Sequence, residues 1–145
     1  MPGYELIDKE EERQVKSIFK NGGVLFRHGF ENLRNNSYKV QEFEKKFALE
    51  MKSKNALAVS SGTAALRVAL STLDLSKGDE VITQSFTFVA TVEAIIESRA
   101  KPVCIDIDQT LNMDPNALEK KINNRTKLTN IHKPYPIKTI HKIKT

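Results

Sequence analysis

The stretch 56–66, with the sequence ALAVSSGTAAL, constrains the fold of this chain more than any other. It opens with a short apolar run, which predicts a buried strand, and it continues into a strong helix former. The apolar residues of this helix recur at i, i+3, i+4 and i+7, on one helical face: Leu66, Ala69, Leu70 and Leu73. We therefore expect a strand, a tight turn and a helix in succession.

The turn between them has the composition of an anion-binding site. Ser61 or Thr63 can cap the helix, and Gly62 lets the backbone approach a ligand closely. A helix N-terminus entered from a strand presents free N–H groups and the positive end of the helix dipole, which suit a phosphate. An ordinary capped helix without a ligand explains the same residues, so this motif alone leaves both interpretations open.

The remaining sequence alternates between the two kinds of element. Helices are predicted over 8–20, 40–47, 89–96 and 114–122. A long loop over 24–37 separates the first two. Short strands are predicted at 80–83 and 103–107, with Ala100-Lys101-Pro102 breaking the helix before the second, and 126–128 begins a further strand. This alternation predicts an α/β fold with right-handed crossovers and a mostly parallel sheet.

Two loops of this predicted sheet favour a ligand site. Ligands of parallel sheets bind at the carboxyl ends of the strands. The segments 61–63 and 85–88 both fall there. Their convergence on one edge strengthens the phosphate interpretation of the first.

Charge and composition limit the other functions. The net charge is +5, but residues 129–145 hold four lysines and no acid, so the rest of the chain is almost neutral. A nucleic-acid binder through this tail is therefore disfavoured, since no basic face with interleaved aromatics is present. No apolar run approaches a membrane span, and the single cysteine, Cys104, allows no internal disulfide, in keeping with a cytoplasmic protein.

Four segments together resemble the DegT/DnrJ/EryC1/StrS aminotransferases, which are pyridoxal-phosphate (PLP) sugar aminotransferases. The matching segments are VSSGTAAL at 59–66, GDEVIT at 78–83, SFTFVAT at 85–91, and KPV at 101–103 with Asp106-Ile107-Asp108. The resemblance extends from about 38 to 127. It implies the amino-terminal part of the type I PLP-dependent aminotransferase fold, truncated in this chain.

The resemblance also implies roles for individual residues. Gly62 and Thr63 match the turn that holds the cofactor phosphate, and Phe88 matches the aromatic that lies on the pyridine ring, with Phe86 packed beside it. Asp106 and Asp108 are expected to be structural acids at a strand end. No residue is assigned to catalysis or to a metal; His132 and His141 in the tail lack a Cys or acid partner.

The sequence departs from the family beyond residue 128. We expect three parts: an amino-terminal helix and loop (1–37), a partial PLP-binding α/β domain (38–128), and a basic tail (129–145) that looks foreign to the fold. The lysine that bonds the cofactor and the acid that pairs with its ring nitrogen have no counterpart here, so the chain alone is expected to be inactive.

The resemblance implies the activity of the intact parent, a homodimer that transfers an amino group from a donor such as glutamate to a keto-sugar nucleotide. A PLP-dependent sugar dehydratase of the same family and a non-catalytic phosphate-binding module are the alternatives.

Overall fold

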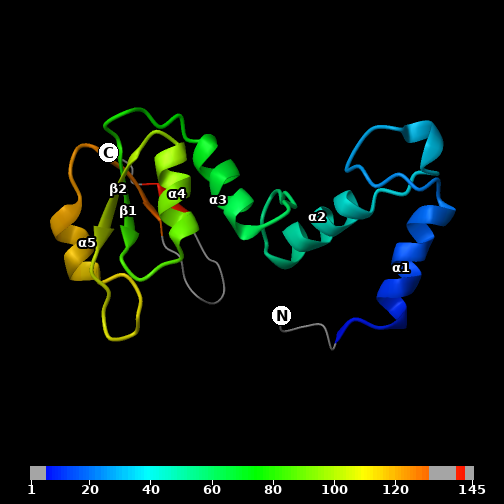
Figure 1. Cartoon of the computed structure of the whole chain (residues 1–145), viewed down its shortest axis with the longest axis horizontal. Helices are drawn as coiled ribbons and strands as arrows, with labels where there is room; N and C mark the ends of the chain where they lie inside the picture. The colour runs from blue at the N-terminus through cyan, green and yellow to red at the C-terminus, as the bar shows by residue number, and fades with distance from the viewer. Residues whose placement is uncertain (1–5, 131–139, 143–145) are drawn as a thin grey trace. The chain divides into compact units, whose positions relative to one another are not determined.

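The structure is a computed structural model that describes residues 6–130 and 140–142. Its contacts divide the chain into two compact units, one ending at Ala58 and the other beginning at Val59. Figure 1 shows the elements of both units along the chain. Each unit is described by itself.

The first unit contains the helices α1 (Lys9–Lys20) and α2 (Lys39–Glu50), with a 3₁₀ turn, η2 (Glu31–Leu33), between them. The Asp8 side chain accepts the Glu10 N–H, and the Glu11 side chain accepts the Asp8 N–H, which closes a capping box. Both predicted helices are thus confirmed. The intervening loop contains several residues with positive φ. Its backbone is therefore irregular, which agrees with the absence of helical or strand periodicity in its sequence.

A partly buried ion pair, with a buried carboxylate and a more exposed guanidinium, connects the loop and the end of this unit to α2. The Arg27 guanidinium donates to both carboxylate oxygens of Glu44, at 2.7–3.2 Å, and the Ala58 N–H donates to the same carboxylate at 2.9 Å. The Glu44 side chain is almost fully buried. Paired hydrogen bonds of this kind between charged groups are the strong ones in proteins.

The predicted strand over 56–59 is wrong. These residues are irregular in the structure, and no described strand pairs with them. The Ala58 N–H, which a ladder would use, is taken by the Glu44 carboxylate. Leu57 and Val59 are exposed, so the apolar run is not buried within the described chain.

Glu44→Gln is expected to destabilise the first unit at neutral pH and to remove part of its acid sensitivity. Hydrogen bonds from Arg27, then from the Ala58 N–H, lower the pKa of Glu44 below its ordinary value of 4.5 in spite of burial. A lowered folded-state pKa gives stability that is complete above the ordinary value and is lost as the pH falls through the lowered one. Thermal melts, together with hydrogen exchange of the Ala58 amide, measure this stability as the pH is lowered from neutral through the pKa of Glu44.

Glu42→Gln on the same helix is the matched control. Glu42 lies 3.8 Å from Lys39 in an exposed pair, and such pairs contribute little. If Glu44→Gln and Glu42→Gln keep the same pH profile, the pair of Arg27 and Glu44 has no special role.

The second unit is built on a four-stranded sheet in the order β2-β1-β3-β4. The strands are β1 (Glu80–Gln84), β2 (Lys101–Ile105), β3 (Thr126–Asn130) and β4 (Ile140–Lys142). β1 pairs in parallel with β2 and with β3, and β4 pairs antiparallel with β3. The predicted α/β fold with a mostly parallel sheet is therefore confirmed.

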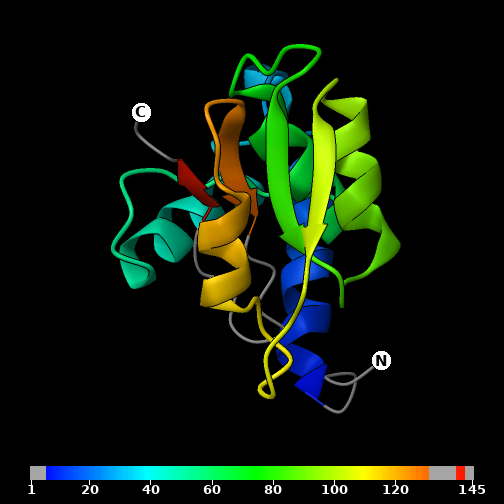
Figure 2. The same ribbon diagram turned by 90° about the vertical axis from the view of Figure 1, so that its left-hand side faces the viewer.

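Helices cover both faces of this sheet (Figures 1 and 2). One core cluster joins α3 (Gly62–Ser71) and α4 (Val89–Glu97) to the sheet; its buried members are Leu70, Val81, Ala94, Ile95, Ala100 and Leu128. On the opposite face, α5 (Pro115–Lys121) packs through Ala117 and Leu118 on Ile82, Ile105 and Met113. Val81 and Ile82 thus face opposite layers, as the alternation of a strand requires.

The strand predicted at 103–107 begins two residues earlier, at Lys101, and ends at Ile105. Pro102, predicted only to break the preceding helix, lies inside β2. An edge strand tolerates proline because one side of its ladder needs no donor, and β2 is at the edge. The strand expected to begin at Thr126 is confirmed and runs to Asn130; His132 and most of the tail lie outside the described residues, as does the side chain of His141.

Candidate functional site

The N-terminus of α3 has unused hydrogen-bond donors. Ser61 is the N-cap: its hydroxyl accepts the Ala64 N–H at 3.1 Å, and its carbonyl accepts the Ala65 N–H at 3.0 Å. Of the two residues offered by the sequence, Ser61 is therefore the cap, and Thr63 is free of that role. Among the described residues, nothing accepts the N–H groups of Gly62 and Thr63.

The space around these donors suits a ligand. Gly62 is exposed, and a Cβ built on it meets no atom within 4 Å. The Thr63 side chain is half-buried, and its hydroxyl has no hydrogen bond to any described residue. Two N–H groups without an acceptor thus lie at the positive end of a helix, beside the open space at Gly62, and Thr63 adds a hydroxyl to this donor set, which suits a phosphate. The residues present fit the phosphate of a PLP cofactor.

Topology places a second feature at the same edge. α3 leads into β1 through its C-terminus, and α4 follows β1, so both helices begin on the side where β1 ends (Figure 1). Phe88 is the N-cap of α4, has extended backbone angles and is 69% exposed. A flat apolar ring at this position is free to stack on a planar ligand.

Phe86, which was expected to pack beside Phe88, is itself 60% exposed. The loop is held by polar contacts instead. The Gln84 amide donates to the Phe86 carbonyl at 2.7 Å, and the hydroxyls of Thr87 and Thr91 lie 3.0 Å apart. These contacts hold the loop that leads to Phe88.

Gln84 and Thr83 are the residues that sequence reasoning missed. Both are buried at the carboxyl end of β1, and the Thr83 hydroxyl and the Gln84 carbonyl oxygen have no partner among the described residues. Buried polar atoms are rarely left without a partner. Two polar side chains at the end of an apolar strand were the available signal.

Three acids of the unit, Asp108, Asp114 and Glu80, make structural contacts. Asp108 accepts the hydroxyl and the N–H of Thr110 at 2.5 and 2.8 Å, which lower the pKa of Asp108, and Asp114 caps α5. Glu80, at the opposite end of β1, binds the Asn123 amide at 2.9 Å and has its pKa lowered by it. In the part of the chain that is described, no three His, Cys, Asp or Glu side chains gather as a metal site.

A mostly parallel sheet with a free helix N-terminus and an exposed aromatic ring at its carboxyl edge defines an α/β protein, and ligands of such sheets bind at this edge. The profile of the DegT/DnrJ/EryC1/StrS aminotransferase family matches residues 7–132. The chain belongs to this family. None of the helices over the described residues is long and apolar enough to cross a bilayer.

Two curated relatives carry the similarity in sequence. The chain is 43% identical over 123 residues to the spore coat polysaccharide biosynthesis protein SpsC of Bacillus subtilis, covering 84% of this chain and 29% of that protein. It is 35% identical over 129 residues to the GDP-perosamine synthase of Vibrio cholerae, covering 88% and 33%. The chain thus spans about a third of the length of these relatives.

Solved structures agree. The PLP form of a sugar aminotransferase from Streptococcus pneumoniae superposes with a TM-score of 0.73 at 30% identity, over 85% of this chain and 29% of that one. A GDP-4-keto-6-deoxymannose-3-dehydratase, solved with a trapped PLP-glutamate geminal diamine, superposes with a TM-score of 0.74 at 25% identity, over 86% and 32%. The type I PLP fold expected from the resemblance is therefore confirmed.

Proposed function

We propose that this chain supplies the phosphate-binding part of a PLP-dependent aminotransferase that acts on keto-sugar nucleotides in polysaccharide or amino-sugar biosynthesis. The observation that carries the proposal is the set of free donors on Gly62 and Thr63, on the sheet edge where Phe88 is exposed. The names of the relatives, a GDP-perosamine synthase and a polysaccharide biosynthesis protein, support the substrate class.

Each residue has a separate task. The N–H groups of Gly62 and Thr63 and the Thr63 hydroxyl bind the cofactor phosphate, and Phe88 lies on one face of its ring and fixes the ring plane. Ser61 orients the turn through its bond to the Ala64 N–H. When bound, PLP supplies the electron sink and the carrier of the amino group. No catalytic role is assigned to a residue of this chain.

The partners are part of the same proposal. Glutamate is the proposed amino donor, which the PLP-glutamate geminal diamine trapped in the dehydratase structure supports. A homodimer is proposed because large apolar side chains, among them Phe86, Val89 and Ile96, stay exposed in the second unit. A cytoplasmic location agrees with the single cysteine; neither a nucleic acid nor a membrane is a proposed partner.

A PLP-dependent sugar dehydratase is the second candidate, because one superposed structure is such an enzyme. Because the chain alone is expected to be inactive, the test uses an intact parent protein that contains residues 1–128. Supplied with PLP, glutamate and a GDP- or UDP-linked keto-sugar, this parent separates the two. An aminotransferase yields 2-oxoglutarate and an amino-sugar nucleotide in equal amounts. A dehydratase yields a deoxy-sugar nucleotide with no amino group on the sugar, and absence of both products contradicts the proposed class.

Thr63→Ala is expected to weaken the binding of pyridoxine 5′-phosphate to the 145-residue chain by about tenfold or more. The reason is the loss of one hydroxyl donor to a charged phosphate. Pyridoxine phosphate has no aldehyde, so it does not react with the many lysines. Amide NMR shifts of Gly62 and Thr63 during titration measure the affinity.

Thr72→Ala is the matched control, since Thr72 follows the same helix and its hydroxyl donates to the Ala69 carbonyl at 2.8 Å. It is expected to bind the ligand as the original chain does. If Thr63→Ala also binds normally and only melts earlier, then Thr63 has a structural role and the proposed site fails.

A further inference from the structure

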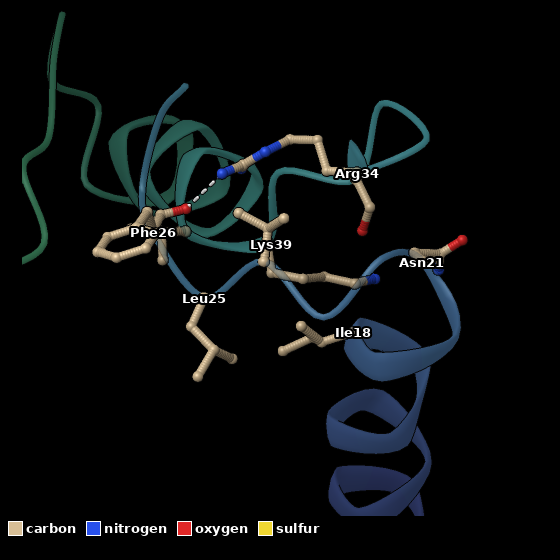
Figure 3. Close-up of a pocket in the computed structure, with 9 residues that line it drawn as sticks. Ile18, Asn21, Leu25, Phe26, Arg34 and Lys39 are labelled. Carbon is tan, nitrogen blue, oxygen red and sulfur yellow. Dashed lines mark hydrogen bonds between the residues drawn. The ribbon is translucent and has the colours of Figure 1, made fainter. Parts of the chain in front are cut away.

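A small pocket in the first unit lies beside the N-terminus of α2, away in the sequence from the α3 site. Figure 3 shows its lining residues, which come from the end of α1, the loop and the start of α2. The polar ones are Asn21, Arg34, Ser37 and Lys39. Its volume is about 50 Å³, room for about four water-sized groups. It is too small for a sugar ring or a nucleobase.

Arg34 is the unusual member of this lining. Its side chain is 2% exposed, yet it forms no ion pair with any described residue. One nitrogen, Nη2, donates to the Phe26 carbonyl at 2.8 Å (Figure 3), and the guanidinium lies 4.6 Å from the centre of the Tyr38 ring. The Nε atom is buried without a partner among the described residues.

A buried guanidinium in this state needs an anion. Arginine stays charged and carries five N–H donors in a fixed fork. Burying a charge is costly unless it is paired and hydrogen-bonded. One carbonyl and one aromatic ring leave the buried Nε–H of Arg34 without an acceptor among the described residues.

The start of α2 offers donors to the same pocket. Tyr38 is the N-cap and gives no side-chain cap, and the first backbone bond of the helix runs from the Glu42 N–H to the Tyr38 carbonyl at 2.9 Å. The N–H groups of Lys39 and Val40, two lining residues, therefore have no acceptor within the described ranges. At 12 residues, the helix is long enough for its dipole to favour an anion there.

The charges around the pocket are positive on balance. Arg34 and Lys39 line it, and no acid does. The Lys39 ammonium also bonds to the Gln14 side chain at 3.1 Å and lies 3.8 Å from Glu42, an exposed acid outside the lining. The donors belong to different parts of the lining: the Arg34 guanidinium points toward Phe26, and the Lys39 ammonium points to another side of the pocket (Figure 3).

We propose that this pocket binds the phosphate group of a small molecule, through the Arg34 guanidinium and the free N–H groups at the start of α2. A tetrahedral oxyanion uses donors from several directions, whereas a planar carboxylate uses only part of them. The volume admits the phosphate group alone, so free phosphate and a phosphomonoester share this chemistry. The site is separate from the one at Gly62 and Thr63 and does not depend on the proposed enzyme class.

The test is an NMR titration of the full 145-residue chain with inorganic phosphate, at pH 7 and at ionic strength held constant with sodium chloride. Saturable shifts are expected for the amides of Lys39 and Val40 and for the Arg34 Nε–H. Glycerol phosphate in a second titration shows whether an ester also enters. Acetate is expected to bind at least tenfold more weakly. Unmoved α2 resonances, or equal affinity for acetate, overturn the proposal.

Two substitutions connect the shifts to the pocket. Arg34→Gln is expected to weaken phosphate binding at least tenfold, because charged hydrogen bonds are lost. Lys39→Met is the second variant, in case Arg34→Gln does not fold. It removes one partly exposed charge and is expected to weaken phosphate binding about threefold. Lys46→Met, on the same helix but outside the pocket, is the control. If Lys39→Met and Lys46→Met bind phosphate equally, the pocket is not the site.

Thr63→Ala distinguishes this pocket from the α3 site. It is expected to reduce the phosphate-induced shifts of Gly62 and Thr63 and to leave those of Lys39 and Val40 unchanged. A joint loss at both places would mean that the α2 shifts are secondary, and the proposal would fail.

Discussion

Gly62→Asp is expected to reduce the affinity of the chain for pyridoxine 5′-phosphate by about a hundredfold or more, equivalent to ~2.7 kcal/mol. The substitution places a carboxylate in the open space at the first residue of α3, where we propose that the phosphate lies. The two negative charges then compete for the same N–H groups. The same carboxylate satisfies the helix dipole, so α3 is expected to be as stable as before or more stable.

Gly62→Asp is thus predicted to lower the affinity for the ligand without lowering the stability of the fold. A capped helix that binds no phosphate would not show this loss of affinity. NMR titration measures the affinity, and thermal denaturation measures the stability. Gly62→Ala is the steric control. Outside its neighbours and its own helix backbone, its Cβ meets no protein atom within 4 Å, so folding is expected to be unaffected, and any loss of affinity measures crowding of the phosphate without the charge. If Gly62→Asp binds as tightly as the original chain, no phosphate lies on this turn.

Local signals were sufficient for the helices that start with a cap. Asp8 with Glu11 and Asp114 with Pro115 each carry their N-terminal signal within four residues, and the structure has a helix after both. The strand predicted at 80–83 is present and one residue longer. It was predictable because the short run that contains it is bounded by a turn and a loop. Such elements depend on neighbours in the sequence, which a single sequence displays.

The errors arose where long-range pairing decides. The run over 56–59 has the composition of a strand, but a strand needs a partner, and the Ala58 N–H is bound by Glu44, 14 residues away. Pro102 appeared to end a helix only, because nothing in the sequence shows that β2 is at the sheet edge. Both outcomes depend on contacts that local composition does not encode.

The candidate site divides in the same way. The motif at 61–63 was enough to predict a capped helix with free N–H donors, because both features depend only on the residues at one helix start. Arg34 gave no comparable signal: an arginine in a loop of irregular sequence is ordinarily exposed, and only the structure shows it buried over Tyr38. Residues that act through burial are the ones that a sequence hides.

Leu128→Ala is expected to destabilise the second unit by about 2–5 kcal/mol, the usual cost of truncating a buried leucine. Leu128 lies in β3, is 0% exposed, and packs in the cluster with Leu70, Val81 and Ile95. β3 is an inner strand, paired on both sides, so the surroundings of Leu128 have little freedom to close the cavity. A fall in melting temperature of about 10 °C or more follows for a unit of this size.

Leu111→Ala provides the comparison, because Leu111 is the same residue type in an exposed loop of the same unit. Its melting temperature is expected to stay within about 2 °C of the original. The contrast also tests the contribution of β3, because the sequence predicted only the beginning of a strand at 126–128. A large loss of stability in Leu128→Ala means that β3 forms part of the core on which α3 and α4 pack. Equal melting temperatures of the two variants would instead mean that Leu128 in β3 adds no stability to the second unit.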